Sequence, residues 1–103
     1  MKISFLLAGT ASVVLSAGPP MGWNSEFAFG CGQNETLVGS TAAYMKMINM
    51  DSYGYKYINL GDCWQSSARE ANGTLLANTT RFPSGLTHLA QNVSAYNMSL
   101  GLY

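Results

Sequence analysis

The sequence predicts an α/β fold in which strands and helices alternate in the order β-α-β-α-β. Three short runs typical of strands are separated by two segments whose apolar residues recur at helical spacing. The middle run, residues 55–64, ends in a carboxylate, a thiol and an indole. Strands joined by crossover helices are parallel. We therefore expect a parallel sheet with its chemistry at the carboxyl ends of the strands, where a parallel α/β barrel places it.

Residues 1–17 are predicted to be a secretory signal peptide. Lys2 supplies positive charge, residues 3–15 are mostly apolar, and the residues around position 17 are small, as a cleavage site requires. The alternative is a membrane anchor, but a spanning helix needs about 20 apolar residues. We expect a secreted chain that begins near Gly18 or Pro19 and has no membrane contact after cleavage.

The first half of the mature chain predicts a strand and then a helix. Residues 21–25 form the strand, which runs into a loop, and residues 27–31 end in turn residues. Asn34 is a good helix N-cap, and turn chemistry at residues 51–54 ends the helix. Its apolar face consists of Leu37, Thr41, Tyr44, Met45 and Ile48. We expect the nearby methionines to pack the helix on the sheet rather than bind a soft metal; they are Met45, Met47 and Met50.

The second half predicts a strand, a long loop, a helix and a third strand. Residues 55–60 form the strand, and the polar residues 65–81 form a surface loop with a turn at Asn72-Gly73. The helix has apolar residues at i, i+3, i+4 and i+7, namely Leu86, Leu89, Ala90 and Val93. Residues 100–103 begin the last strand. A parallel sheet needs both faces covered, so these elements predict part of a larger α/β fold.

Charge and sequence motifs narrow the class of protein. The formal net charge is zero, with five basic and five acidic residues and no basic cluster, so a nucleic-acid partner is not expected. Behind a signal peptide, five N-x-Ser/Thr sequons favour a secreted glycoprotein. Their acceptors are Asn34, Asn72, Asn78, Asn92 and Asn97.

The two cysteines, Cys31 and Cys63, permit one intramolecular disulfide, which an oxidising compartment makes plausible. The alternative is two unrelated buried thiols. The chain has no Cys-x-x-Cys pair and His88 is its only histidine, so we expect no zinc or other metal site.

Blocks of residues along nearly the whole mature chain match one known family in order and spacing. They are residues 18–25 (GPPMGWNS), 29–31, 34–36, 54–59, 62–64, Gly73 with Leu75, 81–86 and 100–103. With these blocks the chain resembles the N-terminal part of secreted eukaryotic α-galactosidases, or melibiases, and fungal members most of all. These enzymes are retaining glycoside hydrolases.

The resemblance implies a (β/α)8 TIM barrel followed by a small β-sandwich domain. A complete barrel needs about 250 residues. Residues 18–103 would therefore supply only its N-terminal β-α-β-α-β portion, a truncated catalytic barrel. The resemblance also implies that Cys31 and Cys63 pair.

The resemblance further implies that Asp62 binds substrate, because a carboxylate at this strand end accepts from two adjacent galactose hydroxyls. From the residues alone, Asp62 would cap local backbone instead. Trp64 either packs beneath the loop or touches sugar, and Trp23 is expected in the core. Two positions depart from the family: Gly61 replaces an aspartate and Glu26 replaces a tryptophan, both at positions that bind galactose.

The family's two catalytic aspartates lie on later strands, so no catalytic residue is assigned here. A catalytic pair of Glu26 and Asp62, particular to this chain, has no support from the family. We predict an α-galactosidase-type hydrolase, present as an inactive fragment, whose family removes terminal α-linked galactose from oligosaccharides or glycoconjugates without a cofactor. The alternative is a non-catalytic secreted glycoprotein, a degenerate homologue with weak or no sugar binding.

Overall fold

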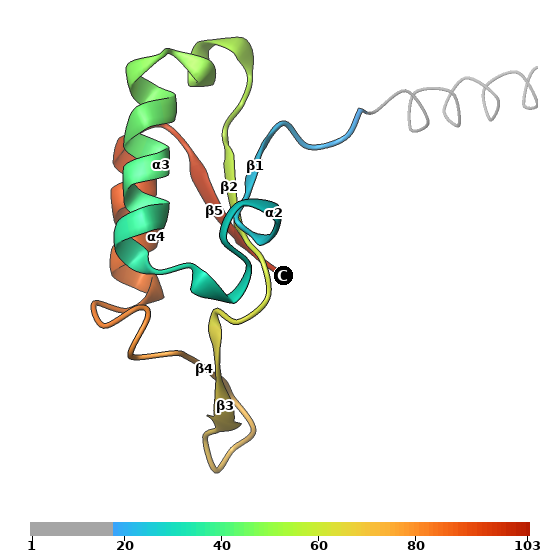
Figure 1. The fold of residues 1–103 in the computed structure, drawn as a ribbon, viewed down its shortest axis with the longest axis vertical. Helices are drawn as coiled ribbons and strands as arrows, with labels where there is room; N and C mark the ends of the chain where they lie inside the picture. Colours follow the sequence, from blue (N-terminus) through green and yellow to red (C-terminus); the bar gives the residue numbers. More distant parts are fainter. Residues whose placement is uncertain (1–17) are drawn as a thin grey trace, which may run out of the picture.

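The computed structural model describes residues 18–103, and the predicted signal peptide lies outside the described residues. Strands and helices alternate along the chain, and two 3-10 turns lie between them (Figure 1). In order, the elements are β1 (Gly22–Asn24), α2 (Glu26–Phe29), η1 (Gly30–Gly32), α3 (Glu35–Met47), η2 (Met50–Tyr53), β2 (Tyr57–Leu60), β3 (Gln65–Arg69), β4 (Leu75–Ala77), α4 (Leu86–Ala95) and β5 (Ser99–Leu102).

The main sheet has the strand order β1-β2-β5, and both pairs of neighbouring strands are parallel. Ile58 of β2 is in register with Trp23 of β1 and Leu100 of β5. The crossover helices α3 and α4 lie side by side against one face of this sheet (Figure 1). The strand order does not reverse as it does in a doubly wound sheet. The predicted β-α-β-α-β succession is confirmed. Each strand is added on the same side of the one before it, as in the wall of a barrel.

The hydrophobic core fills the space between this sheet face and the two helices. Ile58 and Leu60 of β2 are fully buried against apolar side chains of both helices, which include Val38, Ala42, Met45, Leu89 and Val93. Met45 is therefore a core residue, as expected, and Met50 packs at the margin of the core. The prediction is wrong for Met47, which is 69% exposed at the end of α3. It is also wrong for most of the predicted apolar face of this helix, because Tyr44 and Ile48 are exposed and the helix buries Val38 and Ala42 beside Met45 instead.

The helix α3 begins where its capping sequence predicts. The Asn34 side chain accepts a hydrogen bond from the Leu37 N–H at 2.9 Å, which satisfies one of the free donors of the first turn. Glu35 follows in that turn and accepts from both the N–H and the hydroxyl of Ser84 at 3.0 Å. This contact fastens the start of α3 to the segment that leads into α4.

The long loop predicted over residues 65–81 is wrong in part, because it contains an antiparallel hairpin of β3 and β4. The turn falls near Asn72-Gly73 as expected, with Gly73 at φ 88°. The hairpin is formed by polar or exposed residues on both faces, so no alternation of apolar and polar residues signalled it. It extends from the carboxyl end of β2 (Figure 1).

The second face of the main sheet differs from the core face. At the positions that alternate with Ile58 and Leu60 it has small or polar residues, and Tyr57 there is 45% exposed. An uncovered face was expected for a partial α/β fold. Within residues 18–103 no helix is long and apolar enough to cross a membrane.

Candidate functional site at the carboxyl ends of the strands

The carboxyl ends of β1, β2 and β5 meet at one edge of the sheet and form an open pocket of about 360 Å³ there. The pocket is lined by Asn24, Glu26, Phe27, Gly61, Asp62 and Tyr103. Asn24 is the last residue of β1, and each of the others lies one to three residues beyond the end of a strand. This is the edge at which parallel α/β barrels place their chemistry, and Asp62 lies at it as predicted.

The side chain of Asp62 caps local backbone through one of its two oxygens. Its Oδ1 accepts from the backbone N–H of Cys63 at 2.8 Å and from Nε2 of Gln65 at 2.9 Å. Within residues 18–103 its Oδ2 accepts no hydrogen bond, and the residue is exposed. One oxygen therefore caps local backbone while the other is free to accept from a ligand.

Glu26 connects the loop after β1 to the end of β2. Its backbone N–H donates to Oδ1 of Asn24 at 2.8 Å, and its Oε2 accepts from the N–H of Asp62 at 2.9 Å. These two bonds hold the backbone and the carboxylate of Glu26 beside Asp62. The side chain remains exposed and lines the pocket.

Two fully buried polar side chains, Ser25 and Gln33, support this edge from below. The Ser25 hydroxyl donates to Oε1 of Gln33 at 2.5 Å and accepts from the N–H of Gly61 at 2.8 Å. Nε2 of Gln33 donates to the carbonyl oxygens of Gly61 at 3.1 Å and Asp62 at 2.6 Å. Buried polar groups need such partners, so the network fixes the backbone at Gly61 and Asp62.

A disulfide between Cys31 and Cys63 joins the same two loops, with 5.2 Å between the Cα atoms. The resemblance implied this pairing. Cys63 takes a left-handed backbone conformation at φ 71°, which is uncommon for a residue other than glycine. The conformation turns the chain between Asp62 at the pocket and Trp64 in the core.

The two tryptophans do not line the pocket. Trp64 is 6% exposed within the core, and its Nε1 donates to the carbonyl oxygen of Tyr103 at 3.1 Å. Of the two alternatives for Trp64, packing beneath the loop is correct. Trp23 packs at the margin of the core, with its ring edge-on to Phe29 at a centroid distance of 5.9 Å.

The family model described as alpha galactosidase A (Melibiase_2) matches residues 18–103. The chain belongs to the alpha galactosidase A family. It is 44% identical over 89 residues to the alpha-galactosidase of Cyamopsis tetragonoloba, an alignment covering 86% of this chain and 22% of that protein.

Solved alpha-galactosidase structures share the fold. Alpha-galactosidase I from Mortierella vinacea superposes with a TM-score of 0.80 and 35% identity, over 82% of this chain and 21% of that one. The Saccharomyces cerevisiae enzyme, solved with raffinose, superposes with a TM-score of 0.78 and 36% identity, over 82% of this chain and 19% of that one. The chain thus spans about a fifth of the length of these relatives. Its described elements are the N-terminal β-α-β-α-β portion of the family's TIM barrel, and the predicted family and fold class are confirmed.

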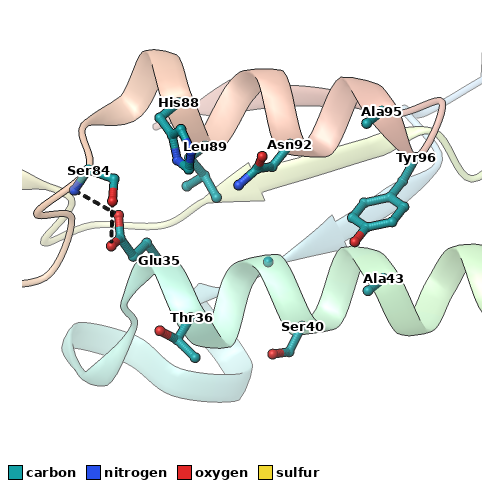
Figure 2. A pocket seen from close by; sticks show the side chains of 11 residues that line it. Glu35, Thr36, Ser40, Ala43, Ser84, His88, Leu89, Asn92, Ala95 and Tyr96 are labelled. Atoms are coloured by element: carbon teal, nitrogen blue, oxygen red, sulfur yellow. Dashed lines mark hydrogen bonds between the residues drawn. The ribbon is translucent and has the colours of Figure 1, made fainter.

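The sequons of this alpha galactosidase A family member differ in exposure. Asn72, Asn92 and Asn97 are exposed, whereas Asn34 and Asn78 are half-buried. The side chains of Asn34, Asn72 and Asn78 accept backbone hydrogen bonds. Asn92 and Tyr96 project from α4 into a groove of about 530 Å³ between α3 and α4 (Figure 2). This groove lies on the helical layer, away from the strand ends. Within residues 18–103, no three His, Cys, Asp or Glu side chains converge as a metal site would need.

Sequence reasoning missed Ser25 and Gln33 as parts of the site. Ser25 lay in one of the family blocks, but nothing in the sequence indicated that its hydroxyl is fully buried. Gln33 lay two residues beyond Cys31, and only the folded structure shows that its amide reaches the end of β2.

Proposed function

We propose that this chain is part of an α-galactosidase-type glycoside hydrolase, in which residues 22–62 form one wall of the sugar pocket. The observation that supports this most is the position of Asp62. Asp62 lines an open pocket at the carboxyl edge of a barrel wall whose family is alpha galactosidase A, and its Oδ2 accepts no hydrogen bond within residues 18–103. A carboxylate there accepts hydrogen bonds from adjacent sugar hydroxyls, and the ligand class is terminal α-linked galactose.

The substrates on this proposal are galactose-containing oligosaccharides or glycoconjugates. The yeast relative was solved with raffinose, an oligosaccharide. The firmly held backbone at Asp62 supports a binding role over the alternative of a degenerate glycoprotein without a sugar site. The disulfide, the predicted signal peptide of residues 1–17 and the five sequons all support secretion.

The proposed contribution of this chain is binding and not bond cleavage. A retaining glycosidase needs a nucleophile and an acid/base about 5–5.5 Å apart. Glu26 and Asp62, the two carboxylates of the pocket, each have one oxygen bonded to a backbone N–H, and the resemblance implies that both catalytic aspartates lie on later strands. We assign the catalytic pair to other strands of a complete barrel, and we assign no cofactor or metal.

The proposal is tested by grafting residues 18–103 into the Mortierella vinacea enzyme in place of the matching segment. We expect the folded chimera to release the aryl group from an aryl α-galactoside. In the chimera, Asp62→Ala should lower kcat/KM by about 10- to 100-fold, since a hydrogen bond to a charged group contributes about 1.5–3 kcal/mol. The matched control is Glu70→Ala, at the exposed turn of the hairpin. A folded chimera without activity, or one in which both variants behave alike, would refute the proposal.

A further inference from the structure

The backbone conformation at position 61 does not require a glycine. Its φ lies outside the left-handed region that favours glycine, since the glycines with positive φ among the described residues are Gly30, Gly54, Gly73 and Gly85. The obstacle to a side chain is instead steric. The three heavy atoms nearest to a Cβ at this position all belong to Glu26.

Glu26 occupies the space that a side chain at position 61 would need. A Cβ on Gly61 would lie 2.7 Å from Cβ and 2.9 Å from Cα of Glu26, and would also meet the carboxylate oxygen Oε2. Contacts below 3.0 Å with a backbone-linked atom are not relieved by rotating a side chain. With the loop after β1 in this position, a side chain at 61 is excluded, and the carboxylate of Glu26 occupies part of the space that it would need.

The carboxylate of Glu26 has one oxygen that accepts no hydrogen bond within residues 18–103. Oε2 of Glu26 accepts from the Asp62 N–H at 2.9 Å, while Oε1 has no hydrogen-bond partner within residues 18–103. The same is true of Oδ2 of Asp62. The two residues thus bring two unengaged acceptors to one pocket, and Phe27 and Tyr103 also line it.

This combination fits a sugar better than a cation. Carboxylates form strong charge-assisted hydrogen bonds with hydroxyls. Phe27 is 95% exposed, and an aromatic ring packs on the apolar face of a pyranose. A calcium ion, in contrast, takes six to eight oxygen ligands, and the pocket supplies two carboxylates.

We propose that Glu26 is a second hydroxyl-accepting residue of this pocket, acting with Asp62 on neighbouring hydroxyls of a pyranose, and that Gly61 provides the room for it. The proposal rests on the function proposed above, because it takes the ligand to be a galactoside. Its steric part is independent of any ligand. The two parts are therefore measured separately.

The binding part is tested on the folded Mortierella vinacea chimera that contains residues 18–103, labelled with ¹⁵N, by titration with methyl β-D-galactopyranoside, a galactoside without the α linkage that the enzyme would cleave. We expect the amides of Glu26, Asp62 and Cys63 to shift. Glu26→Ala should weaken the apparent Kd by about tenfold or more, as loss of a charged hydrogen-bonding partner does, and Asp62→Ala should do the same. Glu70→Ala is the matched control and should leave Kd unchanged.

Three results of this titration would overturn the inference. If Asp62→Ala abolishes the shifts and Glu26→Ala leaves them unchanged, Glu26 is not a sugar ligand and the proposed function stands. If no variant and no wild-type chain responds to the galactoside, the proposed binding function fails together with the inference. If calcium chloride alone shifts the same amides and the galactoside does not, the pocket is a cation site.

The steric part is tested without sugar by a double-mutant cycle on thermal stability. Gly61→Ala should lower Tm clearly when Glu26 is present and by less in the Glu26→Gly background, which removes the Cβ and the carboxylate. Gly39→Ala is the control, because nothing lies within 4 Å of a Cβ there. An equal effect of Gly61→Ala in both backgrounds would overturn this part, even if the galactoside binds.

Discussion

At the carboxyl end of β2, the positions of single backbone atoms are set by two side chains that never reach the pocket. Ser25 and Gln33 are fully buried and share four hydrogen bonds among themselves and the backbone of Gly61 and Asp62. A buried group that loses its partner pays the cost of desolvation without compensation. The position of the free carboxylate oxygen of Asp62 thus depends on the hydrogen bonds that Ser25 and Gln33 make beneath it.

Replacing Gln33 with leucine should therefore destabilise the chain. The substitution leaves the Ser25 hydroxyl and the carbonyl oxygens of Gly61 and Asp62 without their partner, at an expected cost of about 1–3 kcal/mol in the free energy of unfolding. Denaturant unfolding measures this. Gln91→Leu on the exposed side of α4 is the matched control. Equal unfolding midpoints for the two variants would contradict this role of Gln33.

Among the elements, the joint between α3 and η2 contains an ion pair that is partly sheltered from water. Lys46, in the last turn of α3, donates to Oδ2 of Asp51 at 2.7 Å, and Nδ2 of Asn97 donates to the same oxygen at 3.3 Å. Asp51 is buried, whereas Lys46 is partly exposed. The hydrogen bond from Lys46 lowers the pKa of Asp51 below its ordinary value; burial opposes this shift, and the hydrogen bond from Asn97 adds to it.

The direction of this pKa shift predicts a pH dependence of stability. A carboxyl group whose pKa is lower in the folded than in the unfolded state stabilises the fold above the unfolded pKa of about 3.9. That contribution is lost as the pH falls through the folded pKa. We expect Asp51→Asn to lower Tm at pH 7 and the difference from the wild type to shrink below about pH 4. A difference in Tm that stays constant from pH 7 to pH 3 would refute the assignment.

The elements differ in how well the sequence predicted them, and the reason is burial. The helix α4 and the strand β2 each have an apolar face toward one core, and that face repeats in the sequence. The helix α3 was located by its N-cap, but its buried face is Val38, Ala42 and Met45 and not the face that the apolar spacing indicated. The hairpin of β3 and β4 has no buried face, and α2 has four exposed residues, so neither left such a pattern. At the site, Asp62 was predictable as a strand-end carboxylate, but the contact between Glu26 and Gly61 depends on how two loops fold together.

For the whole molecule, the covered and uncovered faces of the sheet agree with a barrel wall. The core lies between the helices and one sheet face, while small and polar residues occupy the other. In a complete barrel that second face points inward, toward the strands opposite. Binding groups at the strand ends of this wall would then face catalytic groups supplied by other strands.

The separation of binding from catalysis predicts that the 103-residue chain by itself is inactive. We expect no release of the aryl group from an aryl α-galactoside by the purified chain. The double substitution Gly61→Asp with Glu26→Trp should not restore activity, because a binding group cannot replace a nucleophile. If the chain hydrolysed the substrate and Asp62→Ala abolished that activity, the assignment of catalysis to other strands would be wrong.

The most direct test of the account is a crystal structure of the Mortierella vinacea chimera containing residues 18–103, grown with galactose. The account predicts galactose in the pocket at the strand ends, with Oδ2 of Asp62 about 2.5–3.0 Å from a sugar hydroxyl oxygen. Galactose bound in the barrel with no hydroxyl within hydrogen-bonding distance of Asp62 would contradict it.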